Sequence, residues 1–142
     1  MEDKPKILSH LSDDEIQDIY KYIDRCNIYT SHFDLAVLLH KIFKNKLRYC
    51  GKNKWQYLDN DKWQTDQRNK IITNWITSDI SDLFLKRYFI WQANKSSDVY
   101  ESMIYDDRVN NLLKLSYNFK KSKFIYPVLK EARGFFDIHN DD

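Results

Sequence analysis

The residues of this sequence best suited to chemistry are six bases gathered in one short segment. Residues 41–54 contain six Lys or Arg side chains and no acidic side chain. These bases are Lys41, Lys44, Lys46, Arg48, Lys52 and Lys54. Tyr49 lies among them, and Trp55, Tyr57 and Trp63 follow soon after. Surfaces that bind single-stranded nucleic acid combine cations that contact phosphates with rings that stack on bases, so the segment predicts such a surface.

Within this segment we expect five bases to contact phosphates and two rings to stack on nucleobases. The predicted binding residues are Lys44, Lys46, Arg48, Lys52, Lys54, Trp55 and Tyr57. The alternative is that the rings pack against helices, because large aromatic side chains dominate protein cores, and that the bases form a solvated face. Lys62, Arg68 and Lys70 continue the basic stretch. A second basic set either extends the surface or solvates a helix; it comprises Lys114, Lys120, Lys121, Lys123, Lys130 and Arg133.

Asp59 and Asp61 have the spacing by which two carboxylates hold a pair of catalytic metal ions. However, Asp59-Asn60-Asp61 between two strands is also typical of a turn. No third acid is evidently placed to complete a metal site. We favour the turn, and a small metal-dependent nuclease is the weakest of the alternative functions.

The cysteines and histidines give no better metal site. Cys26, His32, His40 and Cys50 are separated by five, seven and nine residues, whereas zinc ligands usually come in closer pairs. His40 falls on the apolar side of a predicted helix, which is typical of a buried histidine. With two glycines in the whole chain, far apart, a Walker loop and a dinucleotide-binding loop are excluded. We therefore expect no catalytic residues, no metal and no cofactor.

The charge of the chain is unevenly distributed. The net charge is +2, yet residues 1–24 carry −4 and residues 137–142 carry −3, which leaves +9 for residues 25–136. A basic body is compatible with nucleic acid as a partner. The acidic first helix is most simply a solvated face, or it docks on a basic neighbour such as another copy of the chain.

No segment has the features of a signal peptide or a membrane span. The longest apolar run is Leu35 to Leu39, much shorter than a bilayer requires. The two cysteines are expected to be reduced. The sequence therefore predicts an intracellular protein without a membrane partner.

The hydrophobic periodicity predicts the elements that position these residues. Ser12 to Glu15 is a capping box that opens a helix over residues 13–26, and a second helix runs from Ser31 to about residue 45. The pattern then alternates over residues 46–49, 54–58 and 62–65, which predicts three strands in an antiparallel meander. Because alternate strand residues point the same way, the four rings named above are expected on one face.

Helical periodicity returns at Asp66 and continues to about residue 93, with an interruption expected over residues 78–82, where Ser and Asp compete for backbone hydrogen bonds. A loop over residues 94–97 precedes a helix capped by Ser97 or Asp98, and Pro127 is expected to open the last helix. The predicted fold class is α+β, mainly helical, in a single domain. Two N-terminal helices are followed by a three-stranded meander and about three further helices.

The order of these motifs resembles a known viral domain. The helix entered through Ser31-His32-Phe33-Asp34-Leu35-Ala36 leads into Lys46–Tyr49, the Trp55–Asp59 and Asp61–Trp63 hairpin, a long helix and finally Val128–Phe136. This resembles the helical domain that precedes the superfamily-three helicase in primase–helicases of large DNA viruses, poxviruses included, and of phages and plasmids. The resemblance covers about residues 28–137. It leaves residues 1–27 as an acidic N-terminal helix and residues 138–142 as an acidic tail, a truncated linker to the helicase.

The resemblance implies a non-catalytic module of viral DNA replication, accessory to a primase–helicase or a stand-alone relative. Its expected partners are single-stranded or duplex DNA, bound without sequence preference, and other replication proteins or other copies of itself. Its expected location is the host cytoplasm or nucleus. The ATPase and primer-synthesis activities of the family are not carried over, because this sequence contains neither the ATPase with its Walker loop nor the primase domain.

An interaction protein is the alternative function from a different class. Large DNA viruses also use small, mostly helical proteins of this composition as Bcl-2-like inhibitors of host signalling, which take a partner helix into an apolar groove. The Trp-rich meander argues against this alternative, since an all-helical bundle has no need of residues 46–65.

Overall fold

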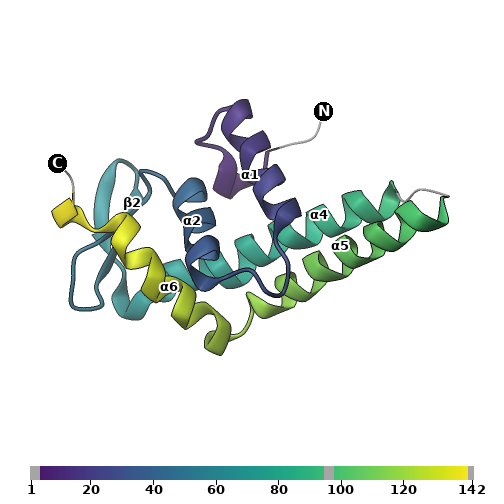
Figure 1. Cartoon of the computed structure of the whole chain (residues 1–142). Coiled ribbons are helices and arrows are strands. Elements are labelled where there is room, and N and C mark those ends of the chain that lie inside the picture. The colour runs from purple at the N-terminus through teal and green to yellow at the C-terminus, as the bar shows by residue number, and fades with distance from the viewer. Residues whose placement is uncertain (1–3, 95–97, 141–142) are drawn as a thin grey trace.

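The computed structural model describes residues 4–94 and 98–140, which form a mainly helical fold with one small sheet (Figure 1). The helices are α1 (Asp13–Arg25), α2 (His32–Ile42), α3 (Lys70–Asn74), the π-helix η3 (Trp75–Ile80), α4 (Ser81–Ala93), α5 (Val99–Asn118) and α6 (Ser122–Phe136). The strands are β1 (Leu47–Tyr49), β2 (Trp55–Asp59) and β3 (Lys62–Thr65), antiparallel in the order β1-β2-β3. The predicted fold class and order of elements are confirmed.

Three helices begin where their capping residues predict. Ser12 accepts a hydrogen bond from the Glu15 backbone amide (3.2 Å), and the Glu15 carboxylate accepts one from the Ser12 amide (3.0 Å), which completes the capping box. Ser31 caps α2 by accepting from the Asp34 amide (3.0 Å). Asp98 caps α5 in the same way, whereas residues 95–97 of the predicted loop, including Ser97, and Asp141 and Asp142 of the predicted tail lie outside the described residues.

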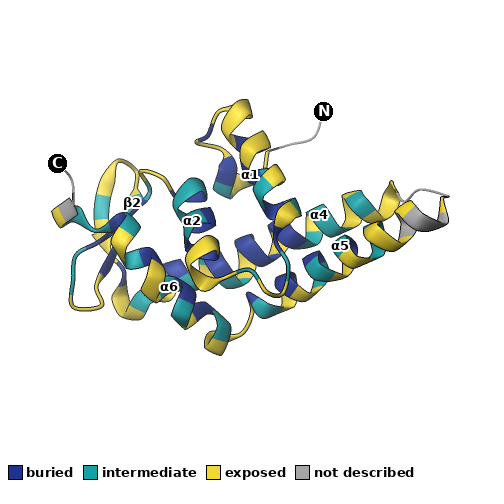
Figure 2. Ribbon diagram, viewed as in Figure 1, coloured by how far each residue is buried: buried dark blue, intermediate teal, exposed yellow. Residues whose placement is uncertain are grey.

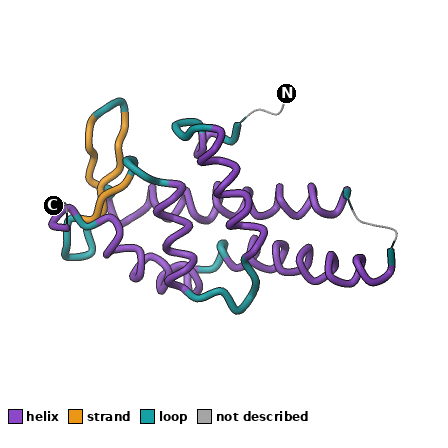
Figure 3. The backbone as a smooth tube through the Cα atoms, turned by 45° about the horizontal axis from the view of Figure 1, so that its top comes forward, coloured by secondary structure: helices purple, strands orange, loops and turns teal. Residues whose placement is uncertain are grey.

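The meander lies at one end of the molecule, and the end of α4 and the start of α5 lie at the other (Figures 1 and 3). Buried residues concentrate where α2, α6 and the first part of α4 meet, and exposed ones increase along the outer part of the α4–α5 hairpin (Figure 2). Ser81 and Ser116 join the two helices of this hairpin near its inner end. The Ser81 hydroxyl donates to the Ser116 carbonyl (2.7 Å), and the Ser116 hydroxyl donates to the Ser81 carbonyl (2.8 Å).

The predicted interruption at residues 78–82 is replaced by a wider helical turn. The chain stays helical from α3 through η3 into α4, with π-type geometry over Trp75–Ile80. Ser81 does not compete for the backbone of its own helix, because its hydroxyl bonds to α5 instead. Ile76 and Ile80 are fully buried, so tertiary packing holds this segment helical.

The prediction that Pro127 opens the last helix is wrong. α6 begins at Ser122 and holds Pro127 in its interior. A proline inside a helix removes one backbone hydrogen bond and is costly. The buried stripe of Ile125, Val128 and Ala132 spans the proline on both sides and outweighs that cost.

Candidate nucleic-acid interface

Two turns with left-handed backbone shape the meander. The turn between β1 and β2 contains Gly51, Lys52 and Asn53 with φ of 86°, 53° and 59°. The turn between β2 and β3 is Asn60-Asp61, with φ of 49° and 65°, between the paired residues Asp59 and Lys62. A two-residue loop with two positive φ values is the preferred connection of a twisted hairpin. The turn interpretation of Asp59-Asn60-Asp61 is thus confirmed.

The pairing register places the four rings on two faces of the sheet. Tyr49 lies opposite Trp55, and Leu47 lies opposite Tyr57, so these residues share one face. Trp63 lies opposite Leu58, which points to the other face. The prediction of a single aromatic face therefore holds for Tyr49, Trp55 and Tyr57 and is wrong for Trp63. The two-residue turn is the reason, because it pairs Trp63 with Leu58, whose side chain points away from the face that holds Trp55 and Tyr57.

The inner face of the meander belongs to the hydrophobic core. The Trp55 side chain is 1% exposed, and its ring meets Tyr49 and Phe136 edge to face at centroid distances of 5.2 and 5.6 Å. Tyr57 is half-buried, with its ring 6.0 Å from that of Trp75. A ring buried in this way has no face open to a nucleobase, so the prediction that Trp55 stacks on DNA is wrong.

The outer face presents a different aromatic residue, Trp63. The Arg48 guanidinium lies over its ring, with 4.3 Å from the guanidinium carbon to the ring centroid. The Arg48 Nε donates to the Gln56 side-chain oxygen (2.6 Å), which fixes the guanidinium across the middle strand. Trp63 is half-buried and is the one ring of the four on this side. Reasoning from residue types missed it as a candidate stacking residue, although the length of the Asn60-Asp61 turn identifies its face.

The predicted phosphate-binding bases surround this outer face. The carbonyl of Lys46 accepts from the Leu58 amide (3.0 Å) and the carbonyl of Lys54 from the Cys50 amide (2.9 Å), so both residues continue the ladder on either side of Arg48. Lys44 precedes β1, and Lys52 lies in the turn that follows it. Lys44, Lys46, Arg48, Lys52, Lys54 and Trp63 are called the basic surface below. Lys44, Lys52 and Lys54 are exposed, and the other three are half-buried.

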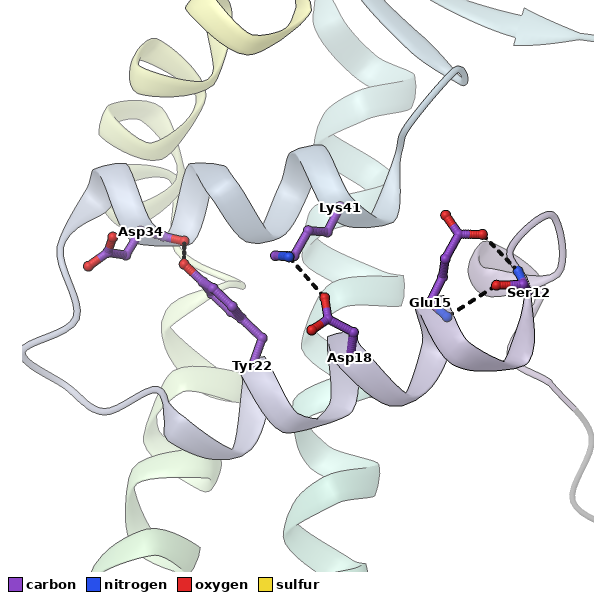
Figure 4. A network of polar contacts seen from close by, with 6 residues as sticks. All are labelled: Ser12, Glu15, Asp18, Tyr22, Asp34 and Lys41. Atoms are coloured by element: carbon purple, nitrogen blue, oxygen red, sulfur yellow. Dashed lines mark hydrogen bonds and ion pairs between the residues drawn. The ribbon is translucent and has the colours of Figure 1, made fainter.

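No cation of the basic surface forms an ion pair with any described residue. Lys41, on the preceding helix, differs because its Nζ lies 2.9 Å from the Asp18 carboxylate of α1 (Figure 4). Asp24 of α1 likewise holds Arg87 of α4 at 2.7 Å. The acids Asp18 and Asp24 of α1 thus pair with bases of α2 and α4 and not with the basic surface.

The candidate metal ligands are dispersed. Cys26 is buried at the end of α1, where burial raises the pKa of its thiol to about 12, and Cys50 is half-buried beside the β1–β2 turn. His40 packs between Phe135 and Phe136 at centroid distances of 5.4 and 5.3 Å. Burial there, followed by the nearby charges of Lys44 and Lys41, lowers the pKa of His40. Within residues 4–94 and 98–140, no three His, Cys, Asp or Glu side chains are grouped so that they could hold a metal ion.

The helices were also checked for membrane-spanning character, and the chain was compared with known proteins. Among the described helices, none combines the length and the apolar character needed to cross a bilayer. A comparison of the chain with protein-family models, curated proteins and solved structures finds no match.

Proposed function

We propose that this chain is a non-catalytic module that binds DNA without sequence preference through the basic surface. The observation that carries the proposal is that no described carboxylate lies within ion-pair distance of the five cations of the basic surface, one of which, Arg48, lies over the Trp63 ring. Cations already paired within a protein gain little from a phosphate, whereas unpaired ones release counterions from DNA when they bind it.

The arrangement suits a single strand better than a duplex. Phosphates of an extended strand would contact Lys46, Arg48 and Lys54 along the outer face of β1 and its turn. Trp63 would supply the ring on which a base stacks, which contributes about 1–3 kcal/mol per base in such proteins. None of these contacts reads a base edge, so binding would be independent of sequence.

The biological setting of the proposal rests on the similarity of residues 28–137 to the helical domain of viral primase–helicases. In that setting the module would belong to viral DNA replication, in the host cytoplasm or nucleus, next to other replication proteins or other copies of itself. Its task would be to hold DNA or an assembly in place, because neither the ATPase loop nor a metal site is part of the basic surface.

The experiment that tests DNA binding is a salt titration with a fluorescently labelled oligothymidylate. Affinity should fall steeply as salt rises, with a slope of about −0.7 per phosphate contact in a plot of log K against log salt concentration. The variant Lys52→Gln/Lys54→Gln should weaken binding and flatten this slope. The matched control Lys21→Gln/Lys114→Gln also removes two exposed charges, from α1 and α5, and should leave both quantities unchanged. Equal losses in the two variants would refute the basic surface as the binding site.

A protein partner is the second candidate function, and exposed apolar side chains on the α4–α5 hairpin support it. Phe89 and Met103 are 59% and 65% exposed, and Ile90 and Ile104 lie next to them in the chain. Such a surface suits the apolar side of an amphipathic helix. Binding of labelled helical peptides that is lost in Phe89→Ser/Met103→Ser, together with no binding to DNA, would favour this function over the first.

A further inference from the structure

A pocket of about 190 Å³ lies between the β1–β2 turn, the segment that follows β3, and α6. Its floor includes the buried Trp55, and its polar lining includes Asn53, Asn69, Arg68 and Arg133. No acidic side chain lines it. The volume has room for about six water molecules, so it suits a small polar group and not a whole cofactor.

Arg133 is held rigidly at this pocket without a carboxylate. Its Nη2 donates to the Asn53 side-chain oxygen (2.8 Å), and its guanidinium lies over the Tyr49 ring, 5.2 Å from the centroid. The Arg133 Nε is buried, and no described residue accepts a hydrogen bond from it. A buried donor that carries charge is costly to leave without an acceptor. Arg133 is therefore a preorganised cation whose hydrogen-bonding capacity the protein does not use in full.

Arg68 reaches the same pocket from a strained segment. Arg68 and Asn69 both have left-handed backbone, with φ of 56° and 57°, which non-glycine residues rarely adopt. The buried Asp66 fixes this segment, because its carboxylate accepts from the backbone amides of Ile71 (2.9 Å) and Ile72 (2.8 Å). Strain of this kind persists where the surrounding structure enforces it and is found at ligand clamps.

We propose that this pocket binds a phosphate group, and that its source is the phosphorylated end of a DNA strand lying on the basic surface. Arg68 and Arg133 form no ion pair with any described residue, and arginines are the residues best suited to hold the oxygens of a phosphate. Lys52 and Lys54 of the basic surface flank Asn53 in the chain, which links the surface to the pocket. This inference rests on the proposed function for the source of the phosphate. A free nucleotide offers the same chemistry, and the experiment separates the two.

The test compares two labelled oligothymidylates that differ only in a 5′-phosphate or a 5′-hydroxyl. The phosphorylated strand should bind about tenfold more tightly, as two charge-assisted contacts allow. Arg68→Gln and Arg133→Gln should abolish this tenfold difference while the hydroxyl strand still binds. The matched controls are Lys70→Gln and Lys130→Gln, which remove exposed charges close in the chain to each arginine but outside the pocket. Both controls should retain the tenfold difference in affinity.

Competition with inorganic phosphate and with thymidine monophosphate identifies the source. Weak competition by both supports a strand end, whereas a monophosphate that binds as tightly as the phosphorylated strand assigns the pocket to free nucleotides and overturns the strand-end source. If the two strands bind with equal affinity, or if the arginine and lysine variants lose the affinity difference equally, the pocket is not a phosphate site. If no strand binds but thymidine monophosphate does so through Arg68, the proposed function fails and the phosphate site stands. Arg68 is exposed, so its variant answers the question even if Arg133→Gln weakens the fold.

Discussion

The two faces of the meander use the same residue types in opposite ways. On the inner face Trp55 is enclosed by Tyr49 and Phe136 and contributes to the core. On the outer face Trp63 lies under the guanidinium of Arg48, which forms no ion pair with any described residue. The role of a tryptophan that lies near lysines in a sequence therefore cannot be assigned until the strand register is known. Mutations that separate the two faces provide the sharpest tests of the structure.

The largest expected effect is on stability and comes from the inner face. Trp55→Ala removes a fully buried ring and should lower the free energy of unfolding by about 3–5 kcal/mol. Trp63→Ala removes a half-buried ring and should lower it by about 1 kcal/mol. Urea denaturation followed by circular dichroism measures both values. Similar losses in the two variants would contradict the assignment of the two tryptophans to different faces.

The next largest effect is on DNA binding and comes from the outer face. Trp63→Ala should weaken oligothymidylate binding by about 1–3 kcal/mol through the lost stacking, whereas Trp63→Phe should retain most of the affinity. Tyr57→Leu removes a ring of the inner face, serves as the control and should bind normally. Fluorescence anisotropy at fixed salt measures the affinities, and an unchanged value for Trp63→Ala would exclude stacking at this position.

A smaller effect separates unpaired cations from paired ones. Arg48→Gln removes a cation that no described carboxylate neutralises, and it should reduce the salt slope of DNA binding by about 0.7. Lys41→Gln removes a cation held by Asp18 at 2.9 Å and should leave the slope unchanged. The same salt titration measures both variants. A larger slope change for Lys41→Gln than for Arg48→Gln would contradict the assignment of Arg48 as the phosphate-binding cation.

The smallest expected effect is on the pH dependence of stability and comes from His40, which packs against Phe135 and Phe136. Burial against Phe135 and Phe136 lowers the pKa of His40 below its ordinary value of 6.5, so the unfolded chain binds its proton more readily than the folded one. Stability should therefore fall as pH decreases through 6.5, and His40→Gln should reduce this dependence. His32→Gln, an exposed position on the same helix, is the control. Urea midpoints at about pH 7.5 and 5.5 give the measurement, and equal pH dependence in wild type and His40→Gln would contradict it.

Local chemistry explains which parts of this structure could be predicted from the sequence. Ser12, Ser31 and Asp98 cap helices because their side chains reach amides only three residues away. Strand positions follow from alternation and were predicted to within one residue. The bases of the basic surface stand out in the sequence because all five fall within residues 44–54.

The features that sequence reasoning missed depend on tertiary contacts or on exact turn length. The face of Trp63 changes with a single residue in the turn at Asn60-Asp61. The helix continues through Pro127 because the buried residues around it hold it in place. The pocket combines Arg68 with Arg133, two residues whose proximity no local pattern encodes.

The reciprocal hydrogen bonds between Ser81 and Ser116 have a mechanical consequence for the α4–α5 hairpin. A slide of one helix along the other by one turn, about 5.4 Å, would separate two buried hydroxyls from the carbonyls that accept from them. The hairpin is thus locked against shear near its inner end. We therefore expect a force on the outer parts of α4 and α5 to tilt the two helices together about the serine pair.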